Sequence, residues 1–272
     1  MITPRVSVVT LSFNQGRYLR QAIESVLLQT YVDLEYIIVD PGSDDGSRRI
    51  IGEYSGRVKT IFEPDNGPAD GLNKGFRIAS GDVFAFLNAD DFLLPDAIQR
   101  VATLFMGRRD AEVIYGHGYI VDVEGKITRR FRSDPFSPRR CAFGASVLMQ
   151  QSTFFRSTAF HRVGGFNPTN RTCWDGELFL DMALKGCRML RSNQYWSAFR
   201  LHRESISGSG KYQQLYLQDR ARLFEKVMGR TERSMDGLWC EAAKFEKLLV
   251  DPALLYWKIR DRVAGLPQLA FT

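Results

Sequence analysis

The chain has 272 residues, of which 44% are hydrophobic and 25% are charged, the composition of a soluble globular protein. No uninterrupted apolar stretch reaches about 18 residues, which argues against a membrane-spanning helix. The net charge of +6 favours an anionic partner such as a phosphate group, a nucleic acid or an anionic membrane surface. Because the basic residues are dispersed and form no known nucleic-acid-binding motif, we do not expect nucleic acid to be the partner.

The cysteines and the first residues indicate a cytoplasmic protein. The four cysteines form no C-x-x-C pair and lie near no histidine at zinc-finger spacing, so neither a zinc site nor a disulfide framework is expected. Reduced thiols are the simplest interpretation. The start, Met1 to Arg5, has no apolar signal segment.

Strands and helices alternate along the first 120 residues. This alternation predicts βαβ units and a mostly parallel sheet flanked by helices. The expected strands are 6–11, 34–40, 58–63, 83–87 and 112–121, and the expected helices are 18–29, 47–54, 69–79 and 96–105.

The second half is less regular. Residues 128–148 are basic and contain prolines, which predicts loops. Helices and short strands resume through 174–185 and 189–202, and the pattern after Tyr212 is mostly helical.

Polar side chains follow three of the predicted strands where each strand ends. They are Ser12 and Asn14 after the first, Asp40, Asp44 and Asp45 after the second, and Asn88, Asp90 and Asp91 after the fourth. The carboxyl ends of parallel strands meet at one edge, so these groups should converge there. Carboxylates that crowd together repel one another unless a cation lies between them. The alternative is that these are polar loops that cap the following helices.

Several of these segments together resemble the family 2 glycosyltransferases, which have the GT-A fold. The resemblance implies an α/β catalytic domain over 1–210, with a nucleotide-sugar half (1–110) and an acceptor half (111–210), and a helical C-terminal extension over 211–272. It is carried by residues 7–14, 38–47, 63–67, 70–75, 87–91, 151–156, 174–180 and 200–202.

The resemblance implies transfer of a sugar, with inversion, from a nucleotide-diphosphate sugar to an acceptor hydroxyl. Asp40 would meet the nucleoside, and Ser12 and Phe13 would line the same pocket. Asn88-Ala89-Asp90 stands at the D-x-D position, where Asp90 would hold Mn²⁺ or Mg²⁺ against the diphosphate. Asn88 replaces the usual first aspartate, which removes one negative charge but retains hydrogen-bonding capacity.

Asp175 stands where the family places its general base, and a carboxylate there could take the proton of the attacking hydroxyl. Glu177 is the competing candidate. Without the resemblance, capping of the following helix would be the better explanation of Asp175.

Further roles are implied for residues around this centre. His202 would contact the metal or the diphosphate, although a lone histidine is more often a polar surface residue. Asp70 and Lys74 would belong to the nucleotide-sugar site, and Gln151 and Asp91 to the acceptor side. Other candidates for diphosphate contacts are Arg156, Arg200 and Arg203.

The C-terminal extension combines apolar, aromatic and basic residues, as in the segment 254–260. Such a composition suits a helix on an anionic membrane, at the inner face of which a lipid-linked glycan acceptor would lie. It equally suits a helix that packs on the catalytic domain or on a second subunit of a homodimer.

Two other functions remain open from the sequence. A nucleotidyltransferase would share the sheet and the acidic metal ligands, but it normally has a glycine-rich, basic loop after its first strand, unlike residues 12–16. A nucleotide-sugar-binding module without turnover is suggested by Asn88. The Walker A, dinucleotide-binding, zinc-protease and hydrolase-elbow motifs are absent from the sequence.

Overall fold

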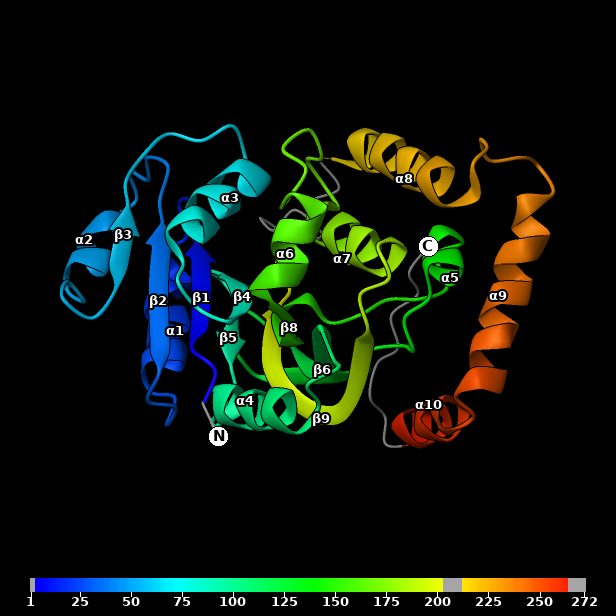
Figure 1. The fold of residues 1–272 in the computed structure, drawn as a ribbon, viewed down its shortest axis with the longest axis horizontal. Helices are drawn as coiled ribbons and strands as arrows, with labels where there is room; N and C mark the ends of the chain where they lie inside the picture. Colours follow the sequence, from blue (N-terminus) through cyan, green and yellow to red (C-terminus); the bar gives the residue numbers. More distant parts are fainter. Residues whose placement is uncertain (1–2, 203–211, 264–272) are drawn as a thin grey trace.

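One β-sheet organises the part of the chain that the computed structural model describes, residues 3–202 and 212–263 (Figure 1). Eight of its nine strands follow the order β3-β2-β1-β4-β8-β6-β9-β5, and the ninth, β7, pairs with β6 outside this path. The first four strands in this order run parallel, as the alternation of strands and helices predicts. They are β1 (Val6–Leu11), β2 (Leu34–Val39), β3 (Lys59–Ile61) and β4 (Val83–Asn88).

Beyond β4 the sheet is mixed. β8 lies antiparallel between β4 and β6, whereas β6 and β9 run parallel to each other. The pairs β5–β9 and β6–β7 are antiparallel. The bounds are β5 (Phe92–Leu93), β6 (Val113–Val121), β7 (Ile127–Phe131), β8 (Thr153–Arg156) and β9 (Met189–Arg200).

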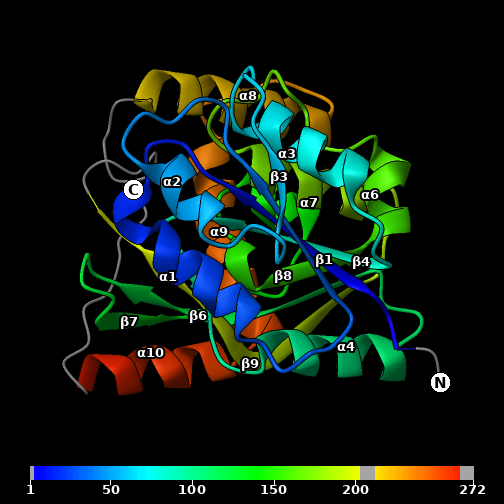
Figure 2. The ribbon, with the colours of Figure 1, turned by 90° about the vertical axis from the view of Figure 1, so that its left-hand side faces the viewer.

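Helices cover both faces of the sheet (Figure 2). Side chains alternate along each strand, so Val8 and Ile38 join the core beneath α1 and α4, and Val9 and Ile37 join the core beneath α3, α6 and α7. Helix α3 lies so close to β1 that a Cβ on Gly75 would be 2.4 Å from the Val9 side chain. The bounds are α1 (Gly16–Leu27), α2 (Ser47–Gly52), α3 (Pro68–Ile78), α4 (Ala97–Gly107), α6 (Ser157–Val163) and α7 (Trp174–Leu184).

The basic segment 128–148 is more ordered than its composition predicts. Its first residues form β7, because they continue the hairpin that begins with β6. Its prolines do not prevent a helix, because Pro138 occupies the first turn of α5 (Pro138–Ala142), where no backbone N–H is needed. The prediction that this segment consists of loops is therefore wrong for both stretches.

The C-terminal region is helical, as expected, and wraps around the sheet. α8 (Gln213–Met228) lies over α7, α9 (Asp236–Val250) runs down one side, and α10 (Ala253–Val263) lies below β6 and β9 (Figures 1 and 2). A small separate core joins α5 to this region through Phe143, Phe224 and Ala243. Among the helices of residues 3–202 and 212–263, none is both long and apolar enough to cross a membrane.

Candidate active site

Three neighbouring strands end in one row at the same edge of the sheet. The register pairs the last residue of β1 with the last residues of β2 and β4. The ladder continues for one more residue, because the Ser12 N–H donates to the Val39 carbonyl and the Ala89 N–H donates to the Leu11 carbonyl. Asp40 and Ala89 thus flank Ser12, about 10 Å from one another, since adjacent strands lie about 4.8 Å apart. The predicted convergence at this edge is confirmed.

Asp40 is fully buried and its carboxylate is surrounded by donors. Oδ1 accepts from the backbone N–H groups of Gly42 and Ser43 and from Nε of Arg48, at 2.8 to 3.1 Å. Oδ2 accepts from the Ser12 hydroxyl at 3.3 Å. Burial alone would raise the pKa of Asp40, but these hydrogen bonds outweigh it and hold the pKa below its ordinary value. Asp40 is therefore a fixed anion at the end of β2.

The loops after β1 and β2 are joined to each other. Asn14, which has a left-handed φ of 51°, accepts from the Asp44 N–H, and its own N–H donates to the Ser43 hydroxyl. Asp45 Oδ2 accepts from the Gly16 N–H at 2.7 Å, at the first residue of α1. Asp44 and Asp45 therefore build the rim of the site, and the side chain of Phe13, 57% exposed, stands on that rim.

Asp90 contacts His202 in the turn that follows β4. Oδ2 of Asp90 lies 2.9 Å from Nε2 of His202, and both side chains are largely buried. The structure thus joins two predicted metal ligands that are more than 110 residues apart in the sequence. Neighbouring Asn88 points its amide toward Asp91, with Nδ2 3.5 Å from Oδ2.

This pair has donor atoms of the kinds that a divalent cation accepts. The carboxylate oxygen and the imidazole nitrogen lie 2.9 Å apart, at hydrogen-bond distance, and both are ligand types for Mn²⁺. Within residues 3–202 and 212–263 no group of three or more His, Cys, Asp and Glu side chains could hold a metal together. Asp90 and His202 are therefore the two residues that would hold an ion here.

Asp91 and Gln151 lie behind Asp90. Both are buried, and Asp91 accepts from Gln151 Nε2 at 2.7 Å and from the Arg200 N–H at 2.8 Å. Burial and the adjacent Asp90 raise the pKa of Asp91 well above its ordinary value. In this arrangement the two residues support the turn that carries Asp90, and their contact with an acceptor stays a prediction.

Arg200 is a structural clamp. Its side chain is buried, and its guanidinium donates to the carbonyls of Asp90, Asp122 and Val123. It also donates to Gln21 and lies 4.7 Å from the ring of Tyr18, whose ring also contacts His202 at 5.1 Å. The Arg200 guanidinium thus makes four hydrogen bonds within the protein, which argues against its interpretation as a diphosphate contact.

Two other arginines were candidates for diphosphate contacts. Arg156 pairs with Val83 at the start of β4, so it stands at the opposite edge of the sheet, and the proposed role for it is wrong. Arg203 lies outside the described residues.

Asp70 and Lys74 occupy the beginning of α3, close to the end of β3. Asp70 accepts from the Asn66 N–H at 2.9 Å, and Lys74 Nζ donates to the Pro64 carbonyl. Their ion pair spans 4.0 Å. These contacts order the loop before α3, and a role in binding the donor stays a prediction for both residues.

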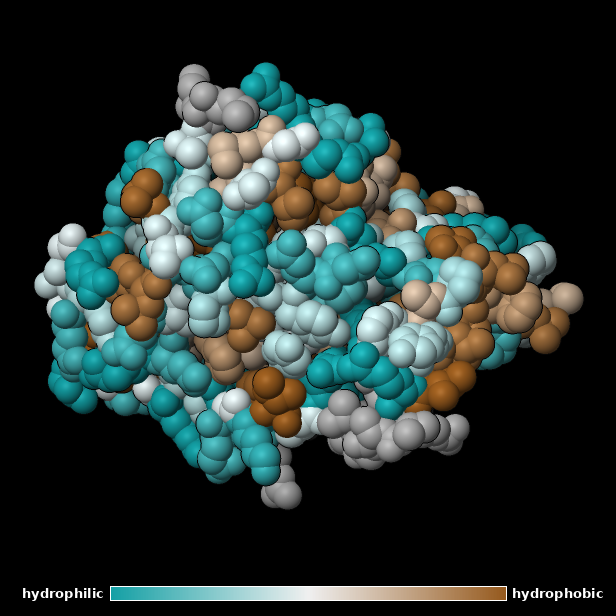
Figure 3. All heavy atoms as spheres, turned by 90° about the horizontal axis from the view of Figure 1, so that it is seen from below, coloured by the Kyte–Doolittle hydropathy of each residue, from teal (hydrophilic) through white to brown (hydrophobic). Residues whose placement is uncertain are grey.

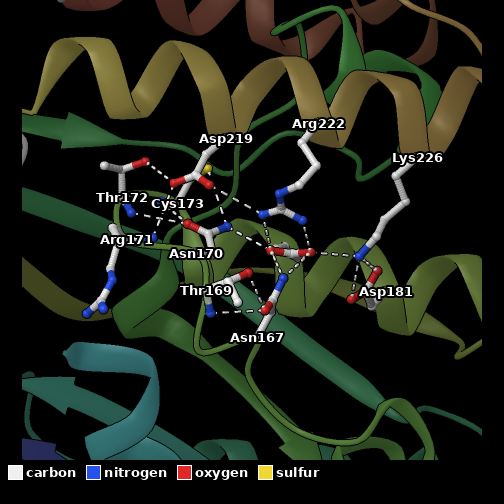
Figure 4. A network of polar contacts seen from close by, with 11 residues as sticks. Asn167, Thr169, Asn170, Arg171, Thr172, Cys173, Asp181, Asp219, Arg222 and Lys226 are labelled. Atoms are coloured by element: carbon white, nitrogen blue, oxygen red, sulfur yellow. Dashed lines mark hydrogen bonds and ion pairs between the residues drawn. The ribbon is translucent and has the colours of Figure 1, made fainter. Parts of the chain in front are cut away.

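Asp175 and Glu177 both lie in the first turn of α7 but differ in environment. The Asp175 carboxylate accepts from its own helix end, the Gly176 N–H at 2.8 Å, and burial raises the pKa of Asp175. The Glu177 carboxylate accepts from Arg222, Lys226, Asn167 and Asn170 (Figure 4). Burial alone would raise the pKa of Glu177, but these partners outweigh it and lower the pKa strongly. Of the two, only Asp175 keeps the properties of a base.

Four residues outside the sequence motifs contact and position the site residues, and sequence reasoning missed them. Arg48, Tyr18, Gln21 and Arg222 each hold a motif residue or its immediate neighbour. No spacing pattern identifies them, because their partners lie on other elements. Arg48 alone could have been found, since it stands eight residues after Asp40, in the first turn of the next helix.

Comparison with known proteins agrees with this geometry. The model of the family described as glycosyl transferase family 2 matches residues 7–164, more than half of the chain. The chain is 36% identical over 150 residues to an uncharacterized glycosyltransferase of Nostoc sp., a match that covers 54% of this chain and 46% of that protein. It is 34% identical over 184 residues to an uncharacterized glycosyltransferase of Mycobacterium tuberculosis, a match that covers 66% of this chain and 70% of that protein.

Solved structures share the fold at low sequence identity. The structure of residues 1–349 of S. aureus TarS in complex with UDP-GlcNAc has a TM-score of 0.66 at 16% identity, covering 90% of this chain and 71% of that one. The mannosyltransferase PcManGT from Pyrobaculum calidifontis, in complex with GDP-Man and Mn²⁺, has a TM-score of 0.64 at 15% identity, covering 97% and 81%. By its sequence, and in agreement with its α/β fold, the chain belongs to glycosyl transferase family 2.

Proposed function

We propose that this chain transfers a sugar from a nucleotide-diphosphate sugar to an acceptor hydroxyl with inversion, and we take a UDP-sugar as the leading donor. The observation that carries the proposal is the pairing of Asp90 with His202 in the turn after β4, two strands away from the buried anion Asp40. Family membership supports the reaction class. The match covers 46% of the Nostoc relative, so the activity of this protein as a whole is part of the proposal.

The residues would divide the reaction between them. Asp40 would hold the nucleoside through its hydroxyl or base N–H groups, in a position fixed by Ser12 and Arg48. Asp90 and His202 would bind Mn²⁺ or Mg²⁺, which when bound supplies positive charge to the leaving diphosphate. Asp175 would take the proton of the acceptor hydroxyl as its oxygen forms a bond to C1. Its raised pKa makes it a stronger base than an ordinary carboxylate.

A polysaccharide or lipid-linked glycan is the proposed acceptor. The 27% identical relatives include proteins described as chondroitin synthase and hyaluronan synthase of Pasteurella multocida, of which the match covers only 19%. The proposed location is the cytoplasmic face of a membrane, with the exposed apolar side chains of α9 and α10 toward the lipid. Seen from below, apolar surface gathers at that end of the molecule (Figure 3). The exposed large apolar residues there are Met235, just before α9, and Leu238, Trp239, Phe245, Leu249, Val250, Leu255, Tyr256 and Ile259.

The decisive experiment measures nucleotide release. Purified protein is incubated with UDP-, GDP- or dTDP-sugars and Mn²⁺, and thermal shifts against the free nucleotides identify the base. Metal-dependent release of nucleoside diphosphate supports the transferase. Tight binding without release indicates a binding module instead, and release of pyrophosphate from a nucleoside triphosphate and a sugar phosphate indicates a nucleotidyltransferase.

Membrane contact is tested separately by sedimentation with phosphatidylglycerol vesicles. We expect the wild type to sediment with the vesicles and the Leu249→Ser/Tyr256→Ser variant to stay in solution. Equal sedimentation of both would refute the lipid-facing orientation of α9 and α10.

A further inference from the structure

A cavity of about 360 Å³ lies away from the strand ends, between α10 and the face of β6, β7 and β9. Figure 2 shows α10 below β6 and β7. Tyr195, on the wall of the cavity, precedes His202 by seven residues, which is at most about 23 Å of extended chain. The two sites thus share β9, and the end of β6 adjoins Arg200 at the candidate active site.

The cavity gathers positive charge from three elements. Arg130 on β7, Arg132 just after it, Arg191 on β9 and Arg260 on α10 all line it, whereas Asp251 is its single acidic lining residue among those described. Asp251 pairs with Arg191 at 2.5 Å. For the Arg130 side chain, no hydrogen bond or ion pair is found within the described part of the chain. Guanidinium groups that converge in a partly buried space favour an anion between them.

The behaviour of His117 agrees with this distribution of charge. Its buried ring lines the same cavity, and Nδ1 accepts from the Ser133 N–H at 3.2 Å. Burial lowers the pKa of His117 to about 4, with further lowering by Arg191 and Arg132. Burial is the larger cause, and the two arginines act in the same direction, so the neutral form of His117 is favoured.

Aromatic rings supply the rest of the wall. Tyr119 and Tyr195 stack with ring centres 4.8 Å apart, and Trp257 has the guanidinium groups of Arg132 and Arg260 at 4.6 and 4.5 Å. Aliphatic lining is confined to two residues, Ala253 and Leu254, so the cavity offers no channel for an acyl chain. Flat rings beside guanidinium groups suit a sugar ring that carries an anionic substituent.

We propose that this cavity binds an acidic sugar unit, one that carries a carboxylate or a phosphate, with the anion at Arg130 and the ring against the aromatic wall. The acidic sugar unit would be part of the acceptor glycan, several sugar units away from the hydroxyl that reacts. This assignment to the acceptor rests on the proposed function. Such a site would hold an acidic glycan in preference to a neutral one.

Calorimetric titration without nucleotide tests the proposal. The probes are a tetramer of galacturonate, glucose 6-phosphate and, as the neutral match, maltotetraose. We expect at least one anionic probe to bind and maltotetraose to bind about tenfold or more weakly. Preference for the uronate or for the phosphate identifies the anion. Binding of neither anionic probe, or equal binding of the neutral tetramer, overturns the proposal.

Variants locate the binding. Arg130→Gln should weaken the anionic probe about tenfold, whereas Arg57→Gln, an exposed arginine between α2 and β3, should leave it unchanged. Thermal unfolding should be the same for both variants, which excludes loss of fold. Unchanged affinity of Arg130→Gln for the anionic probe overturns the proposal. It is also overturned if the protein binds no saccharide and instead binds phosphatidylglycerol vesicles in a way that depends on Arg130. UDP binding with Mn²⁺ is measured in parallel, so that failure of the proposed function is distinguished from failure of this site.

Discussion

The strand-end edge of the sheet and the interface between α7 and α8 both contain buried carboxylates, but they stabilise them differently. At the edge, Asp40 and Asp90 are met mainly by backbone N–H groups, a hydroxyl and an imidazole, with Arg48 as the single cation. At the interface, Glu177 is held by Arg222 and Lys226 of the C-terminal region (Figure 4). A carboxylate that is neutralised by cations of another helix, as Glu177 is, holds the two helices together. An acid held mainly by neutral donors, with at most one cation beside it, retains charge for a ligand.

The same contrast recurs within one helical turn. Asp175 and Glu177 are separated by one residue, yet the environment raises the pKa of the first and lowers that of the second. Desolvation dominates at Asp175, where no ion pair is found among residues 3–202 and 212–263. At Glu177 the cations of α8 dominate. The C-terminal region therefore selects which of the two acids remains available as a base.

The largest effect is expected from Asp90→Ala. Removing this carboxylate should abolish Mn²⁺-dependent UDP binding and reduce turnover about a thousandfold or more, since a bound metal supplies several kcal/mol of charge stabilisation. Calorimetry with and without Mn²⁺ measures the binding. Asp110→Ala, at an exposed carboxylate, is the matched control and should behave as the wild type. Retained metal dependence in Asp90→Ala would show that the strand-end edge holds no cation.

Asp175→Asn should reduce turnover by about 10²- to 10⁴-fold, because a general base contributes that much, while UDP binding stays unchanged. In the wild type, turnover should fall as the pH drops through the pKa of Asp175, which lies above the ordinary 3.8. Asp110→Asn again serves as the control. A variant that loses UDP binding as much as turnover would place Asp175 in the donor site instead.

Arg222→Met should lower the free energy of unfolding by about 1–3 kcal/mol, because the buried Glu177 carboxylate loses its two-pronged partner but keeps Lys226 and two asparagines. Urea unfolding measures the change, and Arg220→Met, at an arginine with only a 4.0 Å pair, is the control. Nucleotide binding should be unaffected. Equal stability of the two variants would mean that the α7–α8 interface does not depend on this ion pair.

The same network predicts how stability depends on pH. Since folding lowers the pKa of Glu177, its contribution to stability is complete above the ordinary value of about 4.5 and is lost as the pH falls below it. The urea midpoint of the wild type should therefore begin to drop as the pH falls below about 4.5 and continue to drop at lower pH, and the drop should be smaller in Glu177→Gln. An identical drop in both proteins would assign the acid sensitivity to other carboxylates.

The sequence predicts the strand-end edge better than the α7–α8 interface, for a physical reason. The alternation of strands and helices determines a parallel sheet, and a parallel sheet brings Ser12, Asp40 and Asp90 to one edge without further information. His202 joins them because β9 ends at the same side. The cationic partners of Glu177 come instead from a helix that lies about 45 residues further along the chain. Amphipathic spacing shows that such a helix exists but not which face of the sheet it covers.

The prolines and arginines of 128–148 illustrate the same limit. Composition alone favours loops there, and the strand β7 forms because β6 offers an unpaired edge. Arg200 is the opposite case. An isolated arginine is ordinarily exposed, yet this one is buried because three carbonyls and an aromatic ring converge on it from separate elements.

The smallest effect is expected from Arg49→Gln, which allows two adjacent arginines to be compared, one exposed and one paired with a buried carboxylate. Arg49 is 79% exposed and pairs with Glu53 one turn later, so its loss should change the free energy of unfolding by no more than about 0.5 kcal/mol. Its neighbour Arg48 donates to the buried Asp40, so Arg48→Gln should weaken UDP binding measurably while Arg49→Gln does not. Calorimetry on this pair of variants separates the two positions. Equal UDP affinity in both would show that Asp40 needs no cation to remain an anion.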